Sequence, residues 1–379
     1  MSNRKTAPSL RFRGFSEPWE EKKLGEICTE IIAGGDVDKE MLEQQGKYPV
    51  IANALTNDGI VGFYENEYRV KAPAVTITGR GDVGHAKARK VNFTPVVRLL
   101  TIKTNHDVDF MENIINTLKI MVESTGVPQL TVPQVARYEL FVPQTVEEEK
   151  RIGSYFQTLD RLIALEQQKY DKLNTVKKSM LEKMFPQKGA KVPEIRFKGF
   201  SEPWEEKKFE DLANRSSLIG FEDNLPRIEY EDIISGTGQL NKNIFAKKSR
   251  KSGILFHKDD VLYGKLRPYL KNWFLASFDG IAVGDFWVLQ TKNIDSSFLY
   301  RLVQCRQFND VANQSIGTKM PRADWKLISK TMFFVPTSLS EQTKIGSYFQ
   351  NLDRLITSQG RKIEKLRNLK KACLEKMFV

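Results

Sequence analysis

The pattern of apolar and polar positions divides the chain into two kinds of segment, and each kind occurs twice. Residues 11–143 and 196–336 are rich in Gly, Pro, aromatic and β-branched residues, and short apolar runs such as APAVTIT (72–78) predict strands between turns. Residues 145–185 and 338–378 contain no proline and are dense in Leu, Glu, Lys, Gln and Met, which predicts two long helices. The pattern therefore indicates an α+β protein.

Sequence repeats show that these segments belong to two tandem units. The decapeptide GFSEPWEEKK occurs identically at 14–23 and 199–208, and KRIGSYFQTLDRLI at 150–163 returns as TKIGSYFQNLDRLI at 343–356. A period close to half the chain excludes a short-period solenoid. We expect a first strand-rich domain (1–143), a central helix (144–185), a second strand-rich domain (186–337, with a linker at 186–195) and a distal helix (338–379).

Both expected helices begin at a capping sequence and carry a heptad pattern. Thr145 with Glu148, and Ser338 with Glu341, match the S/T-x-x-E capping box just after a proline. Apolar residues then recur at alternating spacings of four and three, which favours pairing of the two helices over packing of each helix on its own domain. We call this row of positions the helix seam. Four polar residues interrupt it, namely Glu166, Lys177, Gln359 and Lys370.

Composition narrows the class of protein. The 379 residues are 40% hydrophobic and 28% charged, enough for two or three domains with their own cores. No apolar run approaches the roughly 18 residues of a membrane span, and the N-terminus does not resemble a secretory signal. The three cysteines (Cys28, Cys305 and Cys373) are far apart in sequence, which argues against a disulfide framework and for a reducing compartment. The expected location is the cytoplasm, without a membrane span.

The net charge of +12 suggests a polyanionic partner, but its distribution is uneven. Residues 1–143 carry 18 basic and 18 acidic side chains, whereas residues 338–379 carry 9 basic and 4 acidic ones. A nucleic-acid contact therefore has to come from local clusters. Charge alone leaves open the alternative of a basic protein with a solvated surface.

Motifs that would mark an enzyme are missing from the sequence. The segment from Gly79 to Gly84 matches GxGxxG, but no amphipathic helix follows it, as a dinucleotide site requires. Neither a Walker A sequence nor the Asn/Asp-Pro-Pro-aromatic tetrapeptide of amino-methyltransferases occurs. The three histidines (His85, His106 and His257) are isolated, so metal sites and catalytic triads have little support. We expect a binding protein with no catalytic residues, metal or cofactor.

Basic side chains cluster instead at one aligned turn of each unit, where they suit phosphate contact and approach to base edges. In the first unit these residues are Arg80, His85, Lys87, Arg89 and Lys90. In the second unit, at an offset of 185, they are Tyr263, Lys265, Arg267, Tyr269 and Lys271, preceded by Lys247, Lys248, Arg250 and Lys251. A later turn, STGVPQL in one unit and SIGTKMPR in the other, adds Gln129, Lys319 and Arg322. Each of these residues could alternatively lie in a solvated loop.

Several motifs follow one another in a fixed order along the chain. RFxGFxxxWE opens each unit, a YGKLRPYL turn and a glycine turn follow in the second, and FVP leads into a long helix. This order resembles the specificity subunit of type I restriction–modification systems. The resemblance covers essentially the whole chain. It implies two target-recognition domains, each of which reads half of a split, asymmetric site in double-stranded DNA. The first unit departs from the family, because GRGDVGHAKARK stands where the GKLRPYL form is frequent.

The resemblance also implies partners and a role for the helices. The two helices would pair antiparallel as a spacer, and methyltransferase subunits, two of them, would dock there together with restriction and translocase subunits. The chain itself would then be non-catalytic. Two alternatives remain at this stage: a two-domain protein-binding adaptor on a helical stalk without DNA contact, and a standalone nuclease, which the lack of a metal-carboxylate motif disfavours.

An antiparallel pair permits only registers in which facing residue numbers add to 529, 536, 543 and so on in steps of seven. At 529 and 543 a charged residue faces an apolar one, as Glu166 would face Ile363, and burial of such a charge is costly. At 536 Glu166 faces Lys370, Lys177 faces Gln359, and every other pair is apolar. We therefore predict the 536 register, because polar seam residues commonly fix register.

Overall fold

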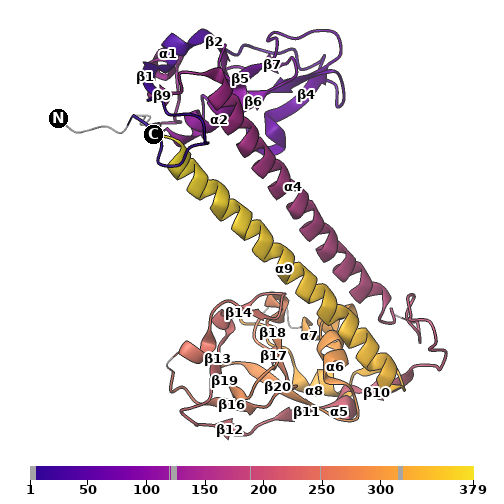
Figure 1. Ribbon diagram of the computed structural model, residues 1–379. Coiled ribbons are helices and arrows are strands. Elements are labelled where there is room, and N and C mark those ends of the chain that lie inside the picture. Colours follow the sequence, from indigo (N-terminus) through magenta and orange to yellow (C-terminus); the bar gives the residue numbers. More distant parts are fainter. Residues whose placement is uncertain (1–5, 119, 121–125, 188, 248, 315–318) are drawn as a thin grey trace. The chain divides into compact units, whose positions relative to one another are not determined.

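The structure, a computed structural model, describes residues 6–118, 120, 126–187, 189–247, 249–314 and 319–379 (Figure 1). Contacts divide the chain into two compact units, which are Met1–Gln167 with Lys362–Val379, and Gln168–Arg361. Two long helices, α4 (Val146–Lys183) and α9 (Leu339–Met377), lie where the sequence predicted them. Each unit includes part of both helices, so each unit contains a helix pair of its own.

Among the described residues of the first unit, the strands form three small sheets. A two-stranded antiparallel ladder joins β1 to β9, a four-stranded sheet has the order β2-β8-β5-β6, and a three-stranded sheet has the order β4-β3-β7. The strands are β1 (Glu20–Lys23), β2 (Cys28–Ala33), β3 (Tyr48–Ile51), β4 (Ile60–Tyr64), β5 (Ala74–Ile77), β6 (Ala86–Arg89), β7 (Thr94–Pro95), β8 (Leu100–Thr104) and β9 (Glu139–Val142). The short helices are α1 (Leu24–Ile27), η1 (Thr56–Gly59), α2 (Val108–Thr117) and α3 (Val132–Ala136).

The second unit repeats this plan with more strands. It has a β10–β21 ladder, two four-stranded sheets in the orders β11-β20-β17-β18 and β12-β16-β19-β13, and a β14–β15 hairpin. The strands are β10 (Glu205–Lys208), β11 (Ala213–Ser216), β12 (Ile219–Gly220), β13 (Arg227–Ile228), β14 (Ile233–Ile234), β15 (Gln239–Leu240), β16 (Gly253–Phe256), β17 (Val261–Gly264), β18 (Trp273–Leu275), β19 (Gly280–Ala282), β20 (Phe286–Thr291) and β21 (Met332–Val335). The short helices are α5 (Phe209–Leu212), η2 (Tyr230–Asp232), η3 (Ile244–Ala246), η4 (Pro268–Leu270), α6 (Ser296–Leu302), α7 (Arg306–Ala312) and α8 (Trp325–Lys330).

The repeated decapeptide serves as framework because its tryptophan anchors the core to the long helix. Trp19 is only 2% exposed, and its Nε1 donates to Glu148 Oε1 at 3.4 Å. Arg11, which precedes the decapeptide, donates from Nε and Nη2 to the two oxygens of the same carboxylate at 2.6 and 2.7 Å. This hydrogen bonding raises the pKa of the Arg11 guanidinium. A buried carboxylate is stable only when such partners satisfy it.

The second unit repeats this arrangement and corrects the prediction of capping boxes. Arg196 binds both oxygens of Glu341 at 2.6 and 2.8 Å, and Trp204 Nε1 donates to Glu341 Oε1 at 3.3 Å. The Thr145 hydroxyl does accept from the Glu148 backbone N–H, at 3.4 Å, as a capping box requires. Both glutamate carboxylates, however, bind Arg and Trp side chains, because buried partners of the framework compete for them.

Within the first unit, α4 and α9 pair antiparallel, but in another register than predicted. Lys370 Nζ binds the Asp160 carboxylate at 2.6 and 2.8 Å, and Lys362 Nζ binds Glu166 Oε1 at 2.8 Å. The residue numbers of these pairs add to 530 and 528, which corresponds to the 529 register and places Ile363 across from Glu166. The 536 register is therefore wrong, and Glu166 does not face Lys370.

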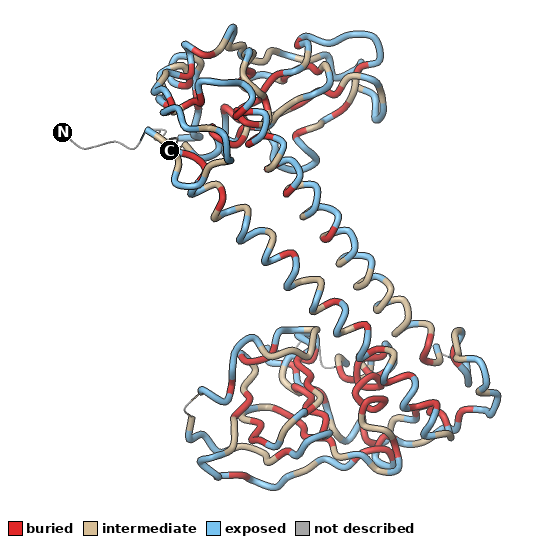
Figure 2. The backbone as a smooth tube through the Cα atoms, in the orientation of Figure 1, coloured by how far each residue is buried: buried red, intermediate tan, exposed pale blue. Residues whose placement is uncertain are grey.

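Within the second unit the same register recurs. Lys177 Nζ binds Asp353 Oδ1 at 2.6 Å, so Lys177 is not opposite Gln359 as predicted. The offset of 193 relates Lys177 and Asp353 to Lys370 and Asp160. Each charged seam residue thus finds its counter-ion beside the apolar residue that it faces. The prediction failed because it counted facing pairs only, whereas long Lys and Glu side chains reach the flanking positions. Buried residues recur between exposed ones along both helices (Figure 2).

Candidate nucleic-acid interface

In the first unit, the glycine turn and the later turn lie side by side. Gly81 N donates to Pro128 O at 3.1 Å, and Leu130 N donates to Gly79 O at 2.8 Å. Between these bonds, Arg80 and Gln129 form an isolated β-bridge, and both residues are exposed. Two segments about 50 residues apart in sequence therefore form one surface, which we name the paired turn.

The second unit contains the same paired turn with other side chains. Arg267 N donates to Pro321 O at 2.8 Å, and Ala323 N donates to Lys265 O at 2.8 Å. This hydrogen-bond pattern matches that of the first unit atom for atom. The equivalence shows that the basic turn and the later turn, treated separately in the sequence, are two halves of one feature.

The equivalence also corrects the sequence alignment by one residue. The bridge of Arg80 with Gln129 corresponds to a bridge of Leu266 with Arg322, so the offset at the first turn is 186 rather than 185. Arg267 consequently corresponds to Gly81. The side chains differ at both positions of the bridge, although the backbone pairing is the same.

The backbone of the paired turn is left-handed at one equivalent position. Gly81 has φ 77° and Arg267 has φ 48°, so both lie in the left-handed region. Lys271, which follows η4, is also left-handed, with φ 56°. A left-handed residue other than glycine costs roughly 1–2 kcal/mol, and such strain concentrates at functional sites. The strain therefore supports a binding role for Arg267 and Lys271.

Two residues that the sequence interpretation missed fix the second paired turn. Asp285 accepts ion pairs from Lys265 at 3.4 Å and from Arg322 at 3.1 Å. Tyr230 accepts a hydrogen bond from Leu266 N at 3.2 Å and donates to the Asp285 backbone oxygen. Burial raises the pKa of Tyr230, so its hydroxyl stays protonated. No sequence signal connects these residues, because they are far apart along the chain.

Tyr263 requires a correction as a DNA contact. The side chain is 1% exposed and belongs to the hydrophobic core, where its ring stacks on Trp287 with centroids 5.6 Å apart. Burial also raises the pKa of Tyr263. The residue lies on β17, whose four residues are all buried, whereas Tyr269, 47% exposed, is the aromatic residue that this segment presents to solvent.

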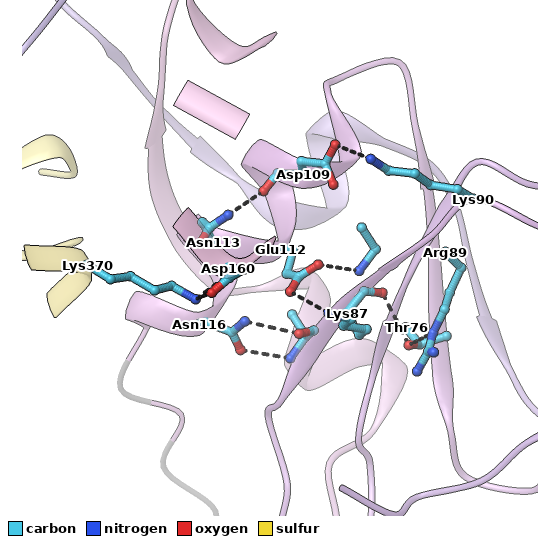
Figure 3. Close-up of polar contacts among 12 residues, drawn as sticks. Thr76, Lys87, Arg89, Lys90, Asp109, Glu112, Asn113, Asn116, Asp160 and Lys370 are labelled. Carbon is cyan, nitrogen blue, oxygen red and sulfur yellow. Dashed lines mark hydrogen bonds and ion pairs between the residues drawn. The ribbon is translucent and has the colours of Figure 1, made fainter. Parts of the chain in front are cut away.

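Basic residues after the first paired turn are held by their own chain (Figure 3). Lys87 Nζ lies 3.4 Å from Glu112 Oε1, and Lys90 Nζ lies 2.6 Å from Asp109 Oδ2. Both carboxylates project from α2 toward the neighbourhood of β6. DNA contact by these lysines would have to compete with the existing ion pairs, so their binding role stays a prediction.

Arg89 and His85 differ in exposure. Arg89 Nε donates to Thr76 Oγ1 at 3.0 Å, and burial lowers the pKa of the Arg89 guanidinium (Figure 3). His85 is exposed and lies 3.9 Å from Asp82. His85 therefore remains available at the end of the turn, whereas Arg89 is tied to the sheet.

A second basic segment of the second unit is largely structural. Lys247 Nζ lies 2.8 Å from both Glu229 and Asp232, and Lys251 Nζ lies 2.7 Å from Glu229. These lysines lower the pKa of the Glu229 carboxyl by hydrogen bonding to it. Arg250 is exposed, and Lys248 lies outside the described residues. Lys319 and Lys271 are exposed beside the paired turn segments.

The described part of the chain offers little for other chemistry. Among those residues no group of three or more His, Cys, Asp and Glu side chains could hold a metal ion. A search of the same residues finds no helix long and apolar enough to cross a membrane. The paired turns are therefore the best-developed candidate sites.

Comparison with known proteins identifies the family. A family model described as the type I restriction modification DNA specificity domain matches residues 16–175 and 201–368, once in each tandem repeat. The chain belongs to this family. The resemblance recognised in the sequence motifs is thereby confirmed, and two specificity domains account for the two repeats.

Individual relatives agree with the family assignment. The chain is 21% identical over 400 residues to the EcoDI type I restriction enzyme specificity subunit of Escherichia coli, covering 95% of this chain and 88% of that protein. It is 28% identical over 146 residues to a Mycoplasma pneumoniae protein described as a type I specificity subunit. That match spans 37% of this chain and only 39% of the relative.

A solved structure supports the fold of this specificity-domain protein. The type I restriction-modification system S subunit from M. genitalium superimposes with a TM-score of 0.70 at 14% identity, over 98% of this chain and 99% of that chain. This likeness concerns the fold alone. It confirms the expected α+β class with two strand-rich domains and two long helices.

Proposed function

We propose that this chain is the DNA sequence-recognition subunit of a type I restriction–modification complex and reads a bipartite, asymmetric DNA target. The observation that carries the proposal is the paired turn, which has one backbone hydrogen-bond pattern and two different sets of side chains. Arg80 with Gln129 would contact one half of the target. Arg267, Tyr269 and Arg322 would contact the other half, since Arg pairs with guanine and exposed aromatic rings stack or wedge at base steps.

The proposal extends to partners and catalysis. Methyltransferase subunits, two of them, and restriction subunits would supply the chemistry, and the chain alone would be inactive. The exposed faces of α4 and α9 are the proposed docking elements for these subunits. The domain limits expected from the sequence, 1–143 and 186–337 for the two target-recognition domains, belong to the same proposal.

A genome-wide methylation map tests this function. Cells that express the complete complex with Arg80→Ala or Arg267→Ala would be compared with cells that express the unaltered chain, by sequencing of modified bases. Each substitution should relax one position in one half of the target, because loss of a bidentate base contact costs roughly 1–3 kcal/mol. The two variants serve as controls for one another.

A change in both halves from either substitution would contradict the two-reader arrangement.

Binding by the purified complex adds a second test. Lys265→Gln should lower the slope of log affinity against log salt by about one unit if Lys265 neutralises a phosphate. A complex that shows no salt-dependent DNA affinity would instead favour the adaptor without DNA contact.

A further inference from the structure

A short turn between β7 and β8, from Val96 to Leu99, lies beside the paired turn of the first unit. Leu99 N donates to Val96 O at 3.0 Å and closes this turn. A Cβ on Gly79 would overlap Arg98 O, so the turn packs directly against the backbone of the paired turn. The Arg98 side chain is partly exposed. The surface around the first paired turn therefore includes a third segment, which the sequence interpretation did not consider.

The side chain of Asn53 fastens this segment to the paired turn. Its Oδ1 accepts from Gly79 N at 2.7 Å, and its Nδ2 donates to Val97 O at 3.1 Å. Because one amide binds both segments, the position of the short turn relative to Gly79 and Arg80 is fixed. A side chain on this turn is thereby held ready for a partner of the paired turn, which lowers the cost of ordering it on binding.

The backbone of Arg98 has a conformation that arginine rarely adopts. Its φ is 70°, in the left-handed region, and it is the third residue of the turn that Val96 and Leu99 close. A positive φ at this position is typical of a type II turn, where glycine or asparagine is usual. Arginine is therefore unfavourable for the local fold, and residues with such strain concentrate at functional sites.

The guanidinium of Arg98 has no hydrogen bond or ion pair with the residues that the structure describes. Two acids of neighbouring segments interact with other cations. Asp82 lies 3.9 Å from His85, and Asp58 acts electrostatically on Arg89. The described part of the chain thus leaves the charge of Arg98 available to a partner.

The corresponding place in the second unit carries the opposite charge. Gly79, which lies against Arg98, corresponds to Lys265 at the offset of 186, and Lys265 N donates to Asp285 O at 2.9 Å. The strand pairs that lead to these contacts, β5 with β8 and β17 with β20, are both antiparallel and correspond in register. Arg98 and Asp285 are therefore equivalent, one a cation and the other an anion.

The ion pairs of the second unit do not account for this arginine. Asp285 pairs with Lys265 and Arg322, whereas the first unit has the uncharged Gly79 and Gln129 at the corresponding positions. A charged residue at this place in the first unit consequently has no turn residue to hold.

We propose that Arg98 contacts a base in the first half of the DNA target and is a specificity-determining residue of the first domain. Phosphates are alike along DNA, so a phosphate contact would favour a cation in both units. Base edges differ, and arginine donates to guanine whereas aspartate accepts from cytosine. The exchange between Arg98 and Asp285 therefore favours contact with a base. The inference rests on the proposed function and adds a reading residue beside Arg80 and Gln129.

A methylation map of cells that express the complete complex tests the proposal. Arg98→Gly removes the guanidinium and suits the left-handed backbone, so the complex should assemble while one position of the target is relaxed. This position should lie in the half that Arg80→Ala affects. DNA affinity of the purified complex should fall roughly five- to 150-fold, the equivalent of one bidentate base contact. Arg98→Asn also suits the left-handed region and should give the same result. Thermal melting establishes that each variant is folded.

Lys71→Gln is the matched control, because Lys71 is an exposed cation that precedes β5, whereas the paired turn follows this strand. This control should leave the map unchanged. A lower salt slope of the affinity without a relaxed position would indicate a phosphate contact and overturn the inference, as would relaxation in the other half only. A bipartite map that Arg98→Gly leaves unchanged would refute the inference alone. An unaltered complex that modifies no bipartite target would refute the proposed function and the inference with it.

Discussion

Gly81 and Arg267 occupy one backbone position in the two paired turns, although one residue has no side chain and the other has the longest cationic one. Glycine adopts the left-handed conformation without cost, whereas arginine does not. Retention of a strained arginine requires a gain elsewhere. Under the proposed function, that gain is contact with DNA.

Substitution of Arg267 by glycine should therefore separate stability from binding. Arg267→Gly removes both the strain and the side chain, so the free energy of unfolding should stay within about 1 kcal/mol of the original, while DNA affinity falls by roughly 1–3 kcal/mol. Chemical denaturation and fluorescence anisotropy provide the two measurements. Arg267→Ala is the control, since it loses the contact and keeps a Cβ in the left-handed region. A large loss of stability in Arg267→Gly would show that the arginine is structural.

At this scale the sequence located the exposed turns better than it predicted which individual side chains are exposed. Basic side chains around the turns could be recognised from composition alone, and Arg80, Arg267 and Tyr269 are indeed exposed. Tyr263 was misplaced because both faces of β17 are buried, so this strand presents none of its side chains to solvent. Asp285 and Tyr230 could not be predicted, because their roles depend on contacts between distant segments.

Two glycines of the repeated IGSYF motif, one on α4 and one on α9, let these helices pack closely against the short helices of the two units. A Cβ on Gly153 would overlap the Asp107 carboxylate at the start of α2, and a Cβ on Gly346 would overlap the Ser297 hydroxyl on α6. Glycine is otherwise unfavourable inside a helix, by roughly 0.5–1 kcal/mol relative to alanine. Close packing thus accounts for its presence in both repeats.

Alanine at Gly346 should destabilise the second unit, against its helix propensity. We expect Gly346→Ala to lower the free energy of unfolding by roughly 1–3 kcal/mol, the usual cost of overpacking. Gly360 lies on the same helix, and a Cβ there would meet Tyr170 only at 3.5 Å, an ordinary contact. Gly360→Ala should therefore be neutral or stabilising. Equal effects of the two substitutions in urea denaturation would argue against close packing at Gly346.

The helix register can be tested by double-mutant cycles. In the observed register Lys370 pairs with Asp160, whereas the register predicted from apolar facing pairs would place it opposite Glu166. Lys370→Ala combined with Asp160→Ala should show a coupling energy of about 0.5–1 kcal/mol, because the pair is partly exposed. The same substitution combined with Glu166→Ala should show none. Coupling to Glu166 alone would restore the 536 register.

Helix positions could be predicted because they depend on local patterns, namely the absence of proline and the heptad spacing. Register could not, because it depends on side chains that reach past the facing residue. Lys362 shows this clearly, since it is outside the seam and still neutralises the buried Glu166. Similarly, the carboxylates of Glu148 and Glu341 were read as local caps, although they bind arginines more than 130 residues away.

Over the whole molecule, each compact unit is completed by a helix end from the other repeat. Phe378 packs against Phe110 and Phe156 in the first unit, with ring centroids 5.7 and 5.8 Å apart. Phe185, at the offset of 193, packs against Phe298 in the second unit at 5.5 Å. Neither repeat therefore contains a complete core of its own, which explains why the LEKMF sequence is duplicated together with the framework motif.

A single repeat should consequently assemble with a second copy of itself. The fragment 1–187 lacks the helix end that fills its core, but its own LEKMF at 181–185 is identical to the missing segment at 374–378. Exchange of this segment between two copies would rebuild both cores, and Lys177 of one copy would replace Lys370 as the partner of Asp160 in the other.

Light scattering should accordingly show a folded dimer of the fragment 1–187. Phe185→Ala should abolish the dimer or weaken it strongly, because truncation of a buried phenylalanine costs roughly 3–5 kcal/mol at each of the two equivalent sites. Asp160→Lys should also weaken it, and Asp160→Lys with Lys177→Asp should recover part of the loss, since the exchanged charges meet again between copies. The fragment 1–167, which has no LEKMF to exchange, is the matched control and should not form the dimer. A stable, folded monomer of 1–187 at micromolar concentration would show that the helix end of the other repeat is dispensable for the core.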